Sequence, residues 1–258
     1  MKKIAVFDSG FGSISVIREI QKIFKGELIY FADQKNFPYG VKSKPHLEKI
    51  IKDTINLLEE KFSPDFIVMA SNTPTLLLWR DIRRISPHFA GIWPPVSEAV
   101  KISRTRNVAI LGTFNVVRSE SLTEWIEHCD MPNDIVVHKI DCSLLVELVE
   151  SGEFLTDKEY CKNVIKEVLE DVFLDNSIDV ATLSSTHLPF LEPLLRSIFK
   201  NVKFLEPTLS FTNILKDYVK DNDLQQNVLR IFTSGDVNLF KKNLQLMGIH
   251  DEVSFLTT

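Results

Sequence analysis

The sequence lacks several features that mark common classes of protein. Its 258 residues include only three cysteines, with no CxxC spacing and no paired histidines at the spacing of metal ligands. It has no run of 18 apolar residues, and its formal net charge of −5 leaves no basic excess. We therefore expect no structural zinc or other metal, no membrane-spanning helix and no nucleic-acid-binding face.

The first ten residues, MKKIAVFDSG, do not resemble a secretory signal. Two lysines precede an apolar run, but Asp8 interrupts that run before it reaches the length of a signal-peptide core. Three cysteines, an odd number, suit a reducing compartment. We expect a soluble cytoplasmic protein.

What the sequence does contain is an alternation of strand-like and helix-like segments. Hydrophobic residues make up 44% of the chain, enough for a sizeable core. Short β-rich runs occupy residues 3–7, 27–33, 65–70, 107–113, 134–140 and 180–186. Longer runs with helical periodicity occupy residues 14–24, 46–60 and 156–173. This alternation predicts an α/β fold with mainly parallel sheets buried on both faces.

Two of these helices have a clear apolar spacing. In the helix over 46–60 it is formed by Leu47, Ile50, Ile51, Thr54 and Leu58. In the helix over 156–173 the four-residue steps of Tyr160, Val164, Val168 and Val172 predict the buried face.

Small polar residues follow four of the predicted strands. They are Asp8-Ser9-Gly10, Ser71-Asn72-Thr73, Gly112-Thr113 and Ser185-Thr186-His187. Ligands of parallel α/β sheets bind beyond the carboxyl ends of the strands, where helix N-termini favour an anion. A carboxylate or a phosphate would serve equally well. Gly10 and Gly12 invite a dinucleotide interpretation, but a third glycine and an acidic partner are not evident.

Seven motifs in order give the chain a resemblance to a known family. They are AVFDSGFGSISV, NFPYGVKSK, ASNTP, LGTFNVVRS, LLVELVESGEF, SSTHLPFL and FTSGD. In this order they resemble the landmarks of the glutamate racemase family. The resemblance implies two similar, pseudo-symmetric α/β lobes facing each other across a cleft, with residues 1–96 and 206–258 in the first lobe and 97–205 in the second. It also implies an amino acid or related carboxylate as substrate, no cofactor, and pairing into a homodimer.

The sequence departs from the family pattern at the two positions whose residues transfer protons in the family. The family uses two opposed cysteines, and the matching positions here are Ser71 and Ser185. Cys161 lies on the apolar stripe of a predicted helix, where a buried structural thiol is expected. Neither Cys129 nor Cys142 is expected at a strand end that precedes a helix. None of the three is therefore predicted to be catalytic.

Serine is a far weaker acid than a thiol, so each serine would need help from a neighbour. The resemblance places Asp8 near Ser71, and His187 and Glu150 near Ser185. We expect these five residues to form the catalytic set, with racemisation very slow or absent.

Further matching positions are those that hold the carboxylate and ammonium groups of the amino acid in the family. They are Ser9, Pro38, Tyr39, Gly40, Asn72, Thr73, Thr113 and Thr186. Hydroxyls, amides and backbone N–H groups suit a zwitterion. Departures from the family at Pro74, Trp93-Pro94-Pro95, Val116 and Leu188 are expected to make the cleft more apolar and to disfavour glutamate.

Three functions remain open at this point. The first is a slow racemase or isomerase, and the second is an amino-acid-binding protein without catalysis. The third is a hydrolase or decarboxylase in which His187 activates Ser185 as nucleophile. Structural alternatives also remain, since Asp8, Ser71 and Ser185 could be ordinary helix caps, His187 a histidine in a turn and Glu150 a solvated helix-end charge.

Overall fold

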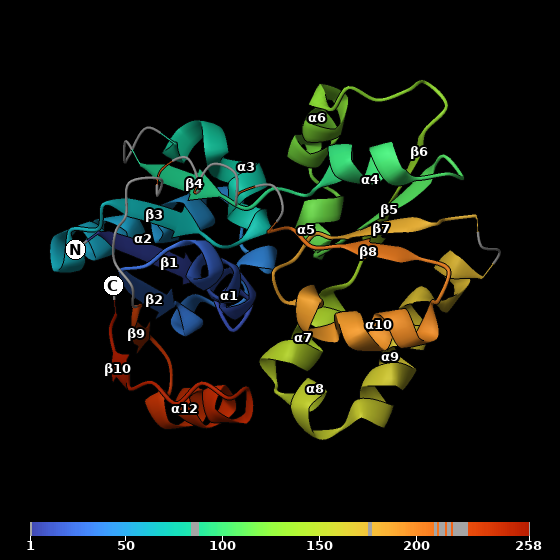
Figure 1. The fold of residues 1–258 in the computed structure, drawn as a ribbon. Coiled ribbons are helices and arrows are strands. Elements are labelled where there is room, and N and C mark those ends of the chain that lie inside the picture. Colours follow the sequence, from blue (N-terminus) through green and yellow to red (C-terminus); the bar gives the residue numbers. More distant parts are fainter. Residues whose placement is uncertain are drawn as a thin grey trace.

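The computed structural model describes residues 2–83, 88–174, 177–208 and 227–257, together with Phe211, Leu215 and Tyr218. Two separate β-sheets flanked by helices make up the molecule (Figure 1). The described strand pairs in both sheets are all parallel. The predicted α/β fold is therefore confirmed.

The first sheet has six strands in the order β10-β9-β2-β1-β3-β4. These strands are β1 (Lys3–Asp8), β2 (Glu27–Ala32), β3 (Phe66–Met69), β4 (Phe89–Gly91), β9 (Val228–Thr233) and β10 (Val253–Phe255). The central strands are buried and apolar because helices cover both faces. β9 pairs with β2, so the C-terminal segment returns to this sheet, as the resemblance implied.

The helices on this sheet are α1 (Ser13–Ile23), α2 (Lys44–Phe62), α3 (Asn72–Ile82) and α12 (Val237–Leu246). Successive strand residues point to opposite faces. Ile4 and Val6 accordingly pack in one cluster with α1 and α12, whereas Ala5 and Phe7 pack in another with α2 and α3. We call this sheet and these helices the first lobe.

The second sheet has four strands in the order β6-β5-β7-β8. They are β5 (Asn107–Gly112), β6 (Val136–Asp141), β7 (Val180–Leu183) and β8 (Lys203–Leu205). The helices around it are α4 (Val96–Ile102), α5 (Phe114–Val117), α6 (Glu120–His128), α7 (Ser143–Glu150), α8 (Glu153–Thr156), α9 (Lys158–Phe173) and α10 (Glu192–Ile198). One face packs against α7, α9 and α10, and the other against α4 and α6. This sheet and these helices form the second lobe.

Three short turns of 3₁₀-helix complete the described elements. They are η1 (Gln34–Asn36), η2 (Tyr39–Val41) and η3 (Leu188–Leu191). η1 and η2 lie in the loop after β2, and η3 follows the polar residues after β7. No helix in the described parts of the chain is long and apolar enough to cross a membrane.

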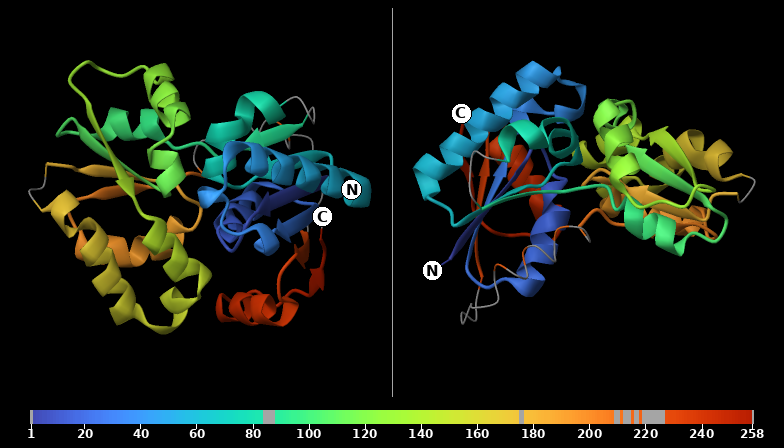
Figure 2. Two further views of the ribbon diagram at one scale, coloured as in Figure 1. Left: turned by 180° about the vertical axis from the view of Figure 1, so that it is seen from behind. Right: turned by 90° about the horizontal axis from the view of Figure 1, so that it is seen from above.

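The two lobes lie side by side and are joined where the chain passes from β4 to α4 and again after β8 (Figure 2). All three tryptophans of the sequence gather at the first crossing. Trp93 stacks on Trp125 of α6 with ring centroids 4.3 Å apart, and Trp79 of α3 meets Trp93 edge-on at 5.5 Å. The Trp125 indole N–H also donates to the Pro94 carbonyl oxygen at 3.2 Å. Helices from both lobes thus clamp the connecting segment between them.

The apolar spacing of α2 is confirmed, because all five of its predicted positions are buried. The prediction for α9 was wrong by one residue. Its buried face is Cys161, Ile165, Leu169 and Phe173, whereas Tyr160 is 47% exposed. Both series have four-residue spacing, and the one with isoleucine, leucine and phenylalanine in place of three valines faces the sheet. Cys161 lies on that face, as expected.

The expectation about Cys142 was also wrong. This residue directly follows β6 and is the N-cap of α7, so it does stand at a strand end before a helix. Burial and the neighbouring charge of Asp141 raise the pKa of the Cys142 thiol well above its ordinary range. A thiol that stays protonated is a poor base, so its position alone does not make it reactive.

The packing predicts which leucines carry stability. Leu183 of β7 is fully buried, and its truncation to alanine should lower the free energy of unfolding by about 2–5 kcal/mol. Leu174 is 71% exposed, so Leu174→Ala should change it by less than about 0.5 kcal/mol. Urea unfolding of both variants measures the difference. Equal effects would contradict the burial described for β7.

Candidate active site

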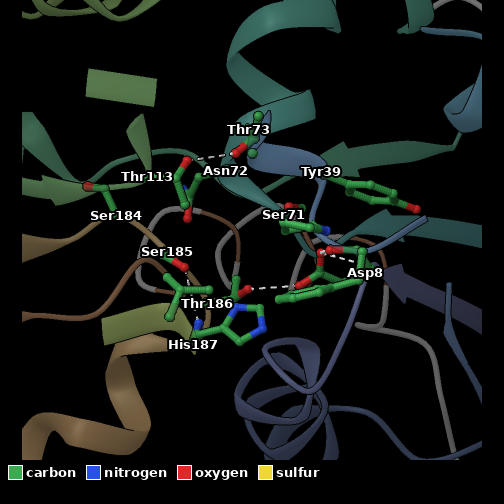
Figure 3. A pocket seen from close by; sticks show the side chains of 15 residues that line it. Asp8, Tyr39, Ser71, Asn72, Thr73, Thr113, Ser184, Ser185, Thr186 and His187 are labelled. Atoms are coloured by element: carbon green, nitrogen blue, oxygen red, sulfur yellow. Dashed lines mark hydrogen bonds between the residues drawn. The ribbon is translucent and has the colours of Figure 1, made fainter. Parts of the chain in front are cut away.

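A cleft lies between the lobes at the carboxyl ends of their strands (Figure 3). Its open space is about 340 Å³, a figure that includes the part exposed to solvent. The residues that line it are Asp8, Ser9, Phe37, Pro38, Tyr39, Gly40, Ser71, Asn72, Thr73, Thr113, Val146, Ser184, Ser185, Thr186 and His187. The structure therefore brings together every predicted site residue except Glu150.

Strand ends deliver these residues from both sheets. Asp8 ends β1, and Ser71 is the N-cap of α3, two residues after β3 ends at Met69. From the second lobe, Thr113 follows β5, and the segment 184–187 follows β7. In Figure 3 the residues of the two lobes face one another across the cleft. A direct contact closes one side, where the Thr73 and Thr113 hydroxyls are 3.2 Å apart.

Asp8 is buried and receives hydrogen bonds from both lobes. Its Oδ1 accepts from the Ser9 backbone N–H at 2.6 Å, and its Oδ2 accepts from the Thr186 hydroxyl at 3.0 Å. Burial raises the pKa of Asp8 to about 6, although the charge of His187, these two donors and the Ser71 hydroxyl lower it in part. A carboxylate with this pKa is a much stronger base than an exposed aspartate. Asp8 and Ser71 lie together, as the resemblance implied.

His187 pairs with Glu150, which stands behind the cleft. Its Nε2 is 3.1 Å from a carboxylate oxygen of Glu150, whose side chain also accepts from the Phe11 backbone N–H at 2.9 Å and from the Gln34 amide at 3.2 Å. Burial lowers the pKa of His187, but the hydrogen bond and charge of Glu150 and the charge of Asp8 outweigh it, so the net shift is upward. His187 is therefore held toward its charged form.

Ser185 has a different partner from the one expected. Its hydroxyl accepts a hydrogen bond from the His187 backbone N–H at 3.4 Å, whereas the imidazole Nε2 is occupied by Glu150. Glu150 thus supports His187 and contacts the first lobe through Phe11 and Gln34. Glu150 was expected near Ser185, but the hydrogen bonds connect the two only by way of His187.

The two glycines after Asp8 leave room for the second lobe. A Cβ at Gly10 would overlap the Glu150 carboxylate, and one at Gly12 would overlap the Thr186 hydroxyl and the His187 ring. Close approach of these second-lobe side chains accounts for both glycines without a dinucleotide.

The predicted substrate-binding residues offer polar groups of both kinds. The Asn72 amide donates to the Ile92 carbonyl at 2.9 Å, while its buried Oδ1 has no hydrogen-bond partner among the described residues. A buried acceptor without a partner suits a cationic donor such as an ammonium group. Tyr39 behaves differently, because its hydroxyl donates to Asp33 at 3.0 Å.

Sequence reasoning missed three of the lining residues, namely Phe37, Val146 and Ser184. Phe37 and Ser184 lie within quoted motifs, so their neighbours gave a signal. Val146 gave none, because an apolar residue in a helix is typical of a core. The expected apolar departures do not line the cleft: Val116 and Leu188 are buried in the hydrophobic clusters of the second lobe, so they do not make it more apolar.

No group of three or more histidine, cysteine, aspartate or glutamate side chains suited to a metal ion occurs among the described residues. The ionisable groups that line the cleft are Asp8, His187 and the phenol of Tyr39. Buried acids and bases of this kind suit proton transfer.

The Asp8 pKa predicts a pH-dependent effect of Asp8→Asn on stability. A carboxyl whose pKa rises from 3.8 to about 6 on folding contributes stability below about pH 3.8, and that contribution is lost as the pH rises through about 6. Asparagine does not ionise, so the variant does not lose this stability as the pH rises. Its free energy of unfolding should exceed that of the unmodified protein by up to roughly 3 kcal/mol at pH 8 and converge on it near pH 4. Denaturant unfolding at both pH values tests this, and a pH-independent difference would contradict it.

The Glu150 contact predicts the behaviour of the His187 ring. Glu150→Gln removes the charge that favours the imidazolium, so the pKa of His187 should fall. A proton NMR titration of the ring measures it. Glu147→Gln on the exposed face of the same helix is the matched control and should leave that pKa unchanged. An unchanged pKa in both variants would show that Glu150 does not set the charge of His187.

No protein-family model matches the sequence. A glutamate racemase from Sulfurihydrogenibium sp. is 30% identical over 242 residues, which cover 93% of this chain and 91% of that protein. One from Aquifex aeolicus is 29% identical over 249 residues, covering 95% and 94%.

Solved structures agree with this result. A glutamate racemase isoform from Bacillus anthracis superposes with a TM-score of 0.87 at 23% identity, covering 99% of this chain and 97% of that one. The glutamate racemase from Aquifex pyrophilus gives 0.75 at 26% identity, with 98% of each chain covered. These findings confirm the resemblance drawn from the motifs. The chain belongs to the glutamate racemase family.

Proposed function

We propose that this protein is a cofactor-independent amino-acid racemase of the glutamate type, in which Ser71 and Ser185 exchange protons with the α-carbon. The observation that carries the proposal is that buried Asp8 and His187 enter one cleft beside these serines, from opposite lobes of a glutamate racemase fold. A glutamate racemase from Francisella tularensis and one from Escherichia coli have been solved with D- and L-glutamate respectively.

The first-lobe arm is Asp8 with Ser71. As the α-proton moves to the Ser71 oxygen, the hydroxyl proton of Ser71 passes to the Asp8 carboxylate, so the serine relays the proton without forming a free alkoxide. The Ser71 hydroxyl helps to hold the Asp8 charge, which supports this pairing. A pKa of about 6 lets Asp8 accept a proton near neutral pH and return it.

The second-lobe arm is Ser185 with His187. The Ser185 hydroxyl gives its proton to the opposite face of the α-carbon, and the His187 imidazolium replaces it. The ring bonds to Glu150 at present, so this step needs a turn of the ring or an intervening water. The reverse reaction uses the same groups with their protonation states exchanged.

The binding groups support a zwitterionic amino acid. Asn72 Oδ1 and Asp8 are acceptors for the ammonium group. The hydroxyls of Ser9, Thr73, Thr113 and Thr186 and the N–H groups beside them are donors for the α-carboxylate. The residues lining the cleft include no lysine or arginine, so hydroxyl and backbone donors would also hold a side-chain carboxylate.

The alternative functions have less support. Hydrolysis or decarboxylation by Ser185 would use the same Ser185–His187 pair, but the relatives that the chain resembles are glutamate racemases, so this reaction is not favoured. A purely amino-acid-binding protein would use the same donors and acceptors and differs from a racemase only in α-proton exchange. Homodimerisation and a cytoplasmic location belong to the proposal as family expectations.

Exchange of the α-proton for deuterium tests the proposal. With L- and D-glutamate and L- and D-aspartate in deuterium oxide, the unmodified protein should wash out the α-proton slowly. The double variant Ser71→Cys/Ser185→Cys should do so faster, by about 10²–10⁴-fold, because thiols ionise far more readily. Proton NMR follows the signal directly.

Two controls make the result decisive. Ser197→Cys adds a thiol on the exposed face of α10 and should not accelerate exchange. In the protein that keeps both serines, Asp8→Asn should abolish α-proton exchange. Thermal stabilisation by glutamate without α-proton exchange would favour an amino-acid-binding protein without catalysis. If neither stabilisation nor exchange occurred in the unmodified protein or in the double-cysteine variant, an amino-acid cleft would be excluded.

A further inference from the structure

The C-terminal segment touches the cleft through a motif that the proposed chemistry does not use. Residues Thr233, Ser234 and Gly235, at the end of β9, lie against the loop after β2. That loop, residues 33–41, carries Pro38, Tyr39 and Gly40 into the cleft. None of the three C-terminal residues lines the cleft itself.

Ser234 joins two parts of this loop with one hydroxyl. The oxygen accepts the Lys35 backbone N–H at 3.0 Å and donates to Asp33 Oδ1 at 3.0 Å. The backbone N–H of Ser234 also donates to the Ala32 carbonyl at 3.0 Å. Ser234 is 8% exposed and Asp33 is fully buried, so water competes little for these bonds.

Asp33 then passes this constraint to the cleft-lining residues. Its carboxylate accepts the Asn36 amide at 2.9 and 3.0 Å and the Tyr39 hydroxyl at 3.0 Å. Its backbone N–H donates to the Asp8 carbonyl at 2.7 Å. Through its backbone N–H and its carboxylate together, Asp33 thus fixes the start, middle and cleft-facing end of the loop in one arrangement.

Thr233 holds the neighbouring loop residue. Its hydroxyl accepts the Gly235 N–H at 3.1 Å and donates to Gln34 Oε1 at 3.0 Å. This polarity turns the Gln34 amide N–H₂ toward Glu150, which it reaches at 3.2 Å. Gly235 completes the contact, because a Cβ there would lie 2.9 Å from the Gln34 Cβ and 2.6 Å from its Oε1.

We propose that Thr233, Ser234 and Gly235 are positioning residues for the amino-acid site. Ser234 sets the substrate loop through Asp33, and Thr233 sets the Glu150–His187 pair through Gln34. The amino-acid ligand rests on the proposed function, but the ordering of the loop does not.

Ser234→Ala is the first test, with Ser103→Ala as its matched control. Ser103 is 9% exposed and its hydroxyl also donates to an aspartate, Asp179, at 2.7 Å. That pair precedes β5 and β7, at the sheet edge opposite the cleft. The two variants therefore lose the same kind of bond in different places.

The first readout needs no ligand. Hydrogen–deuterium exchange of the amides in residues 34–42 should become about tenfold faster in Ser234→Ala than in Ser103→Ala, the effect of losing ~1.4 kcal/mol of local order. The second readout is the affinity for glutamate. Its Kd, or KM where turnover is measurable, should rise about tenfold in Ser234→Ala, with kcat changing much less.

Equal exchange of residues 34–42 in the two variants would overturn the inference, whatever happens to activity. Faster exchange with no glutamate binding by the unmodified protein would leave the positioning role standing and reject the proposed function. Thr233→Val against Thr233→Ser is the second pair, in case Ser234→Ala folds poorly. Only the valine variant should shift the pH dependence of α-proton exchange and the His187 ring titration; identical behaviour of the pair would reject the role of Thr233.

Discussion

The site depends on keeping the Asp8 carboxylate dry between two lobes. Asp8 ends a central strand of the first sheet. Its carboxylate accepts hydrogen bonds from the Ser9 backbone N–H of the first lobe and from the Thr186 hydroxyl of the second, so one buried charge is satisfied from both sides. Moving the lobes apart would expose this group and remove a donor. Other contacts across the cleft, from Thr73 to Thr113 and from Phe11 to Glu150, hold the same spacing.

Serine at positions 71 and 185 changes the demands on this environment. A thiol can hold a negative charge briefly, whereas a serine hydroxyl has to pass a proton along as it receives one. The groups behind the serines therefore matter more here than they would behind thiols. Burial has raised the pKa of Asp8 to about 6 and Glu150 keeps the pKa of His187 high, so a base and an acid are present at neutral pH.

The sequence predicted the parts of the structure that follow from local pattern. Alternation of strand and helix gave the parallel sheets, and small polar residues after the strands marked Asp8, Ser71, Thr113 and Ser185. Contacts between distant segments left no local trace. The predicted orientation of α9 was wrong because two apolar series share its four-residue spacing. Val146 was missed because its sequence pattern is that of a core residue. The bond from His187 to Glu150 rather than Ser185 depends on Gln34 and Phe11, which no short-range pattern connects to them.

The cluster at the first crossing between the lobes makes the molecule its own optical probe. Since Trp79, Trp93 and Trp125 are all the tryptophans in the chain and lie in ring contact across that junction, its indole fluorescence arises entirely there. Rearrangement of the lobes about this segment would alter the overlap of the stacked rings. Emission from the native protein therefore reports the geometry of the crossing without any introduced label.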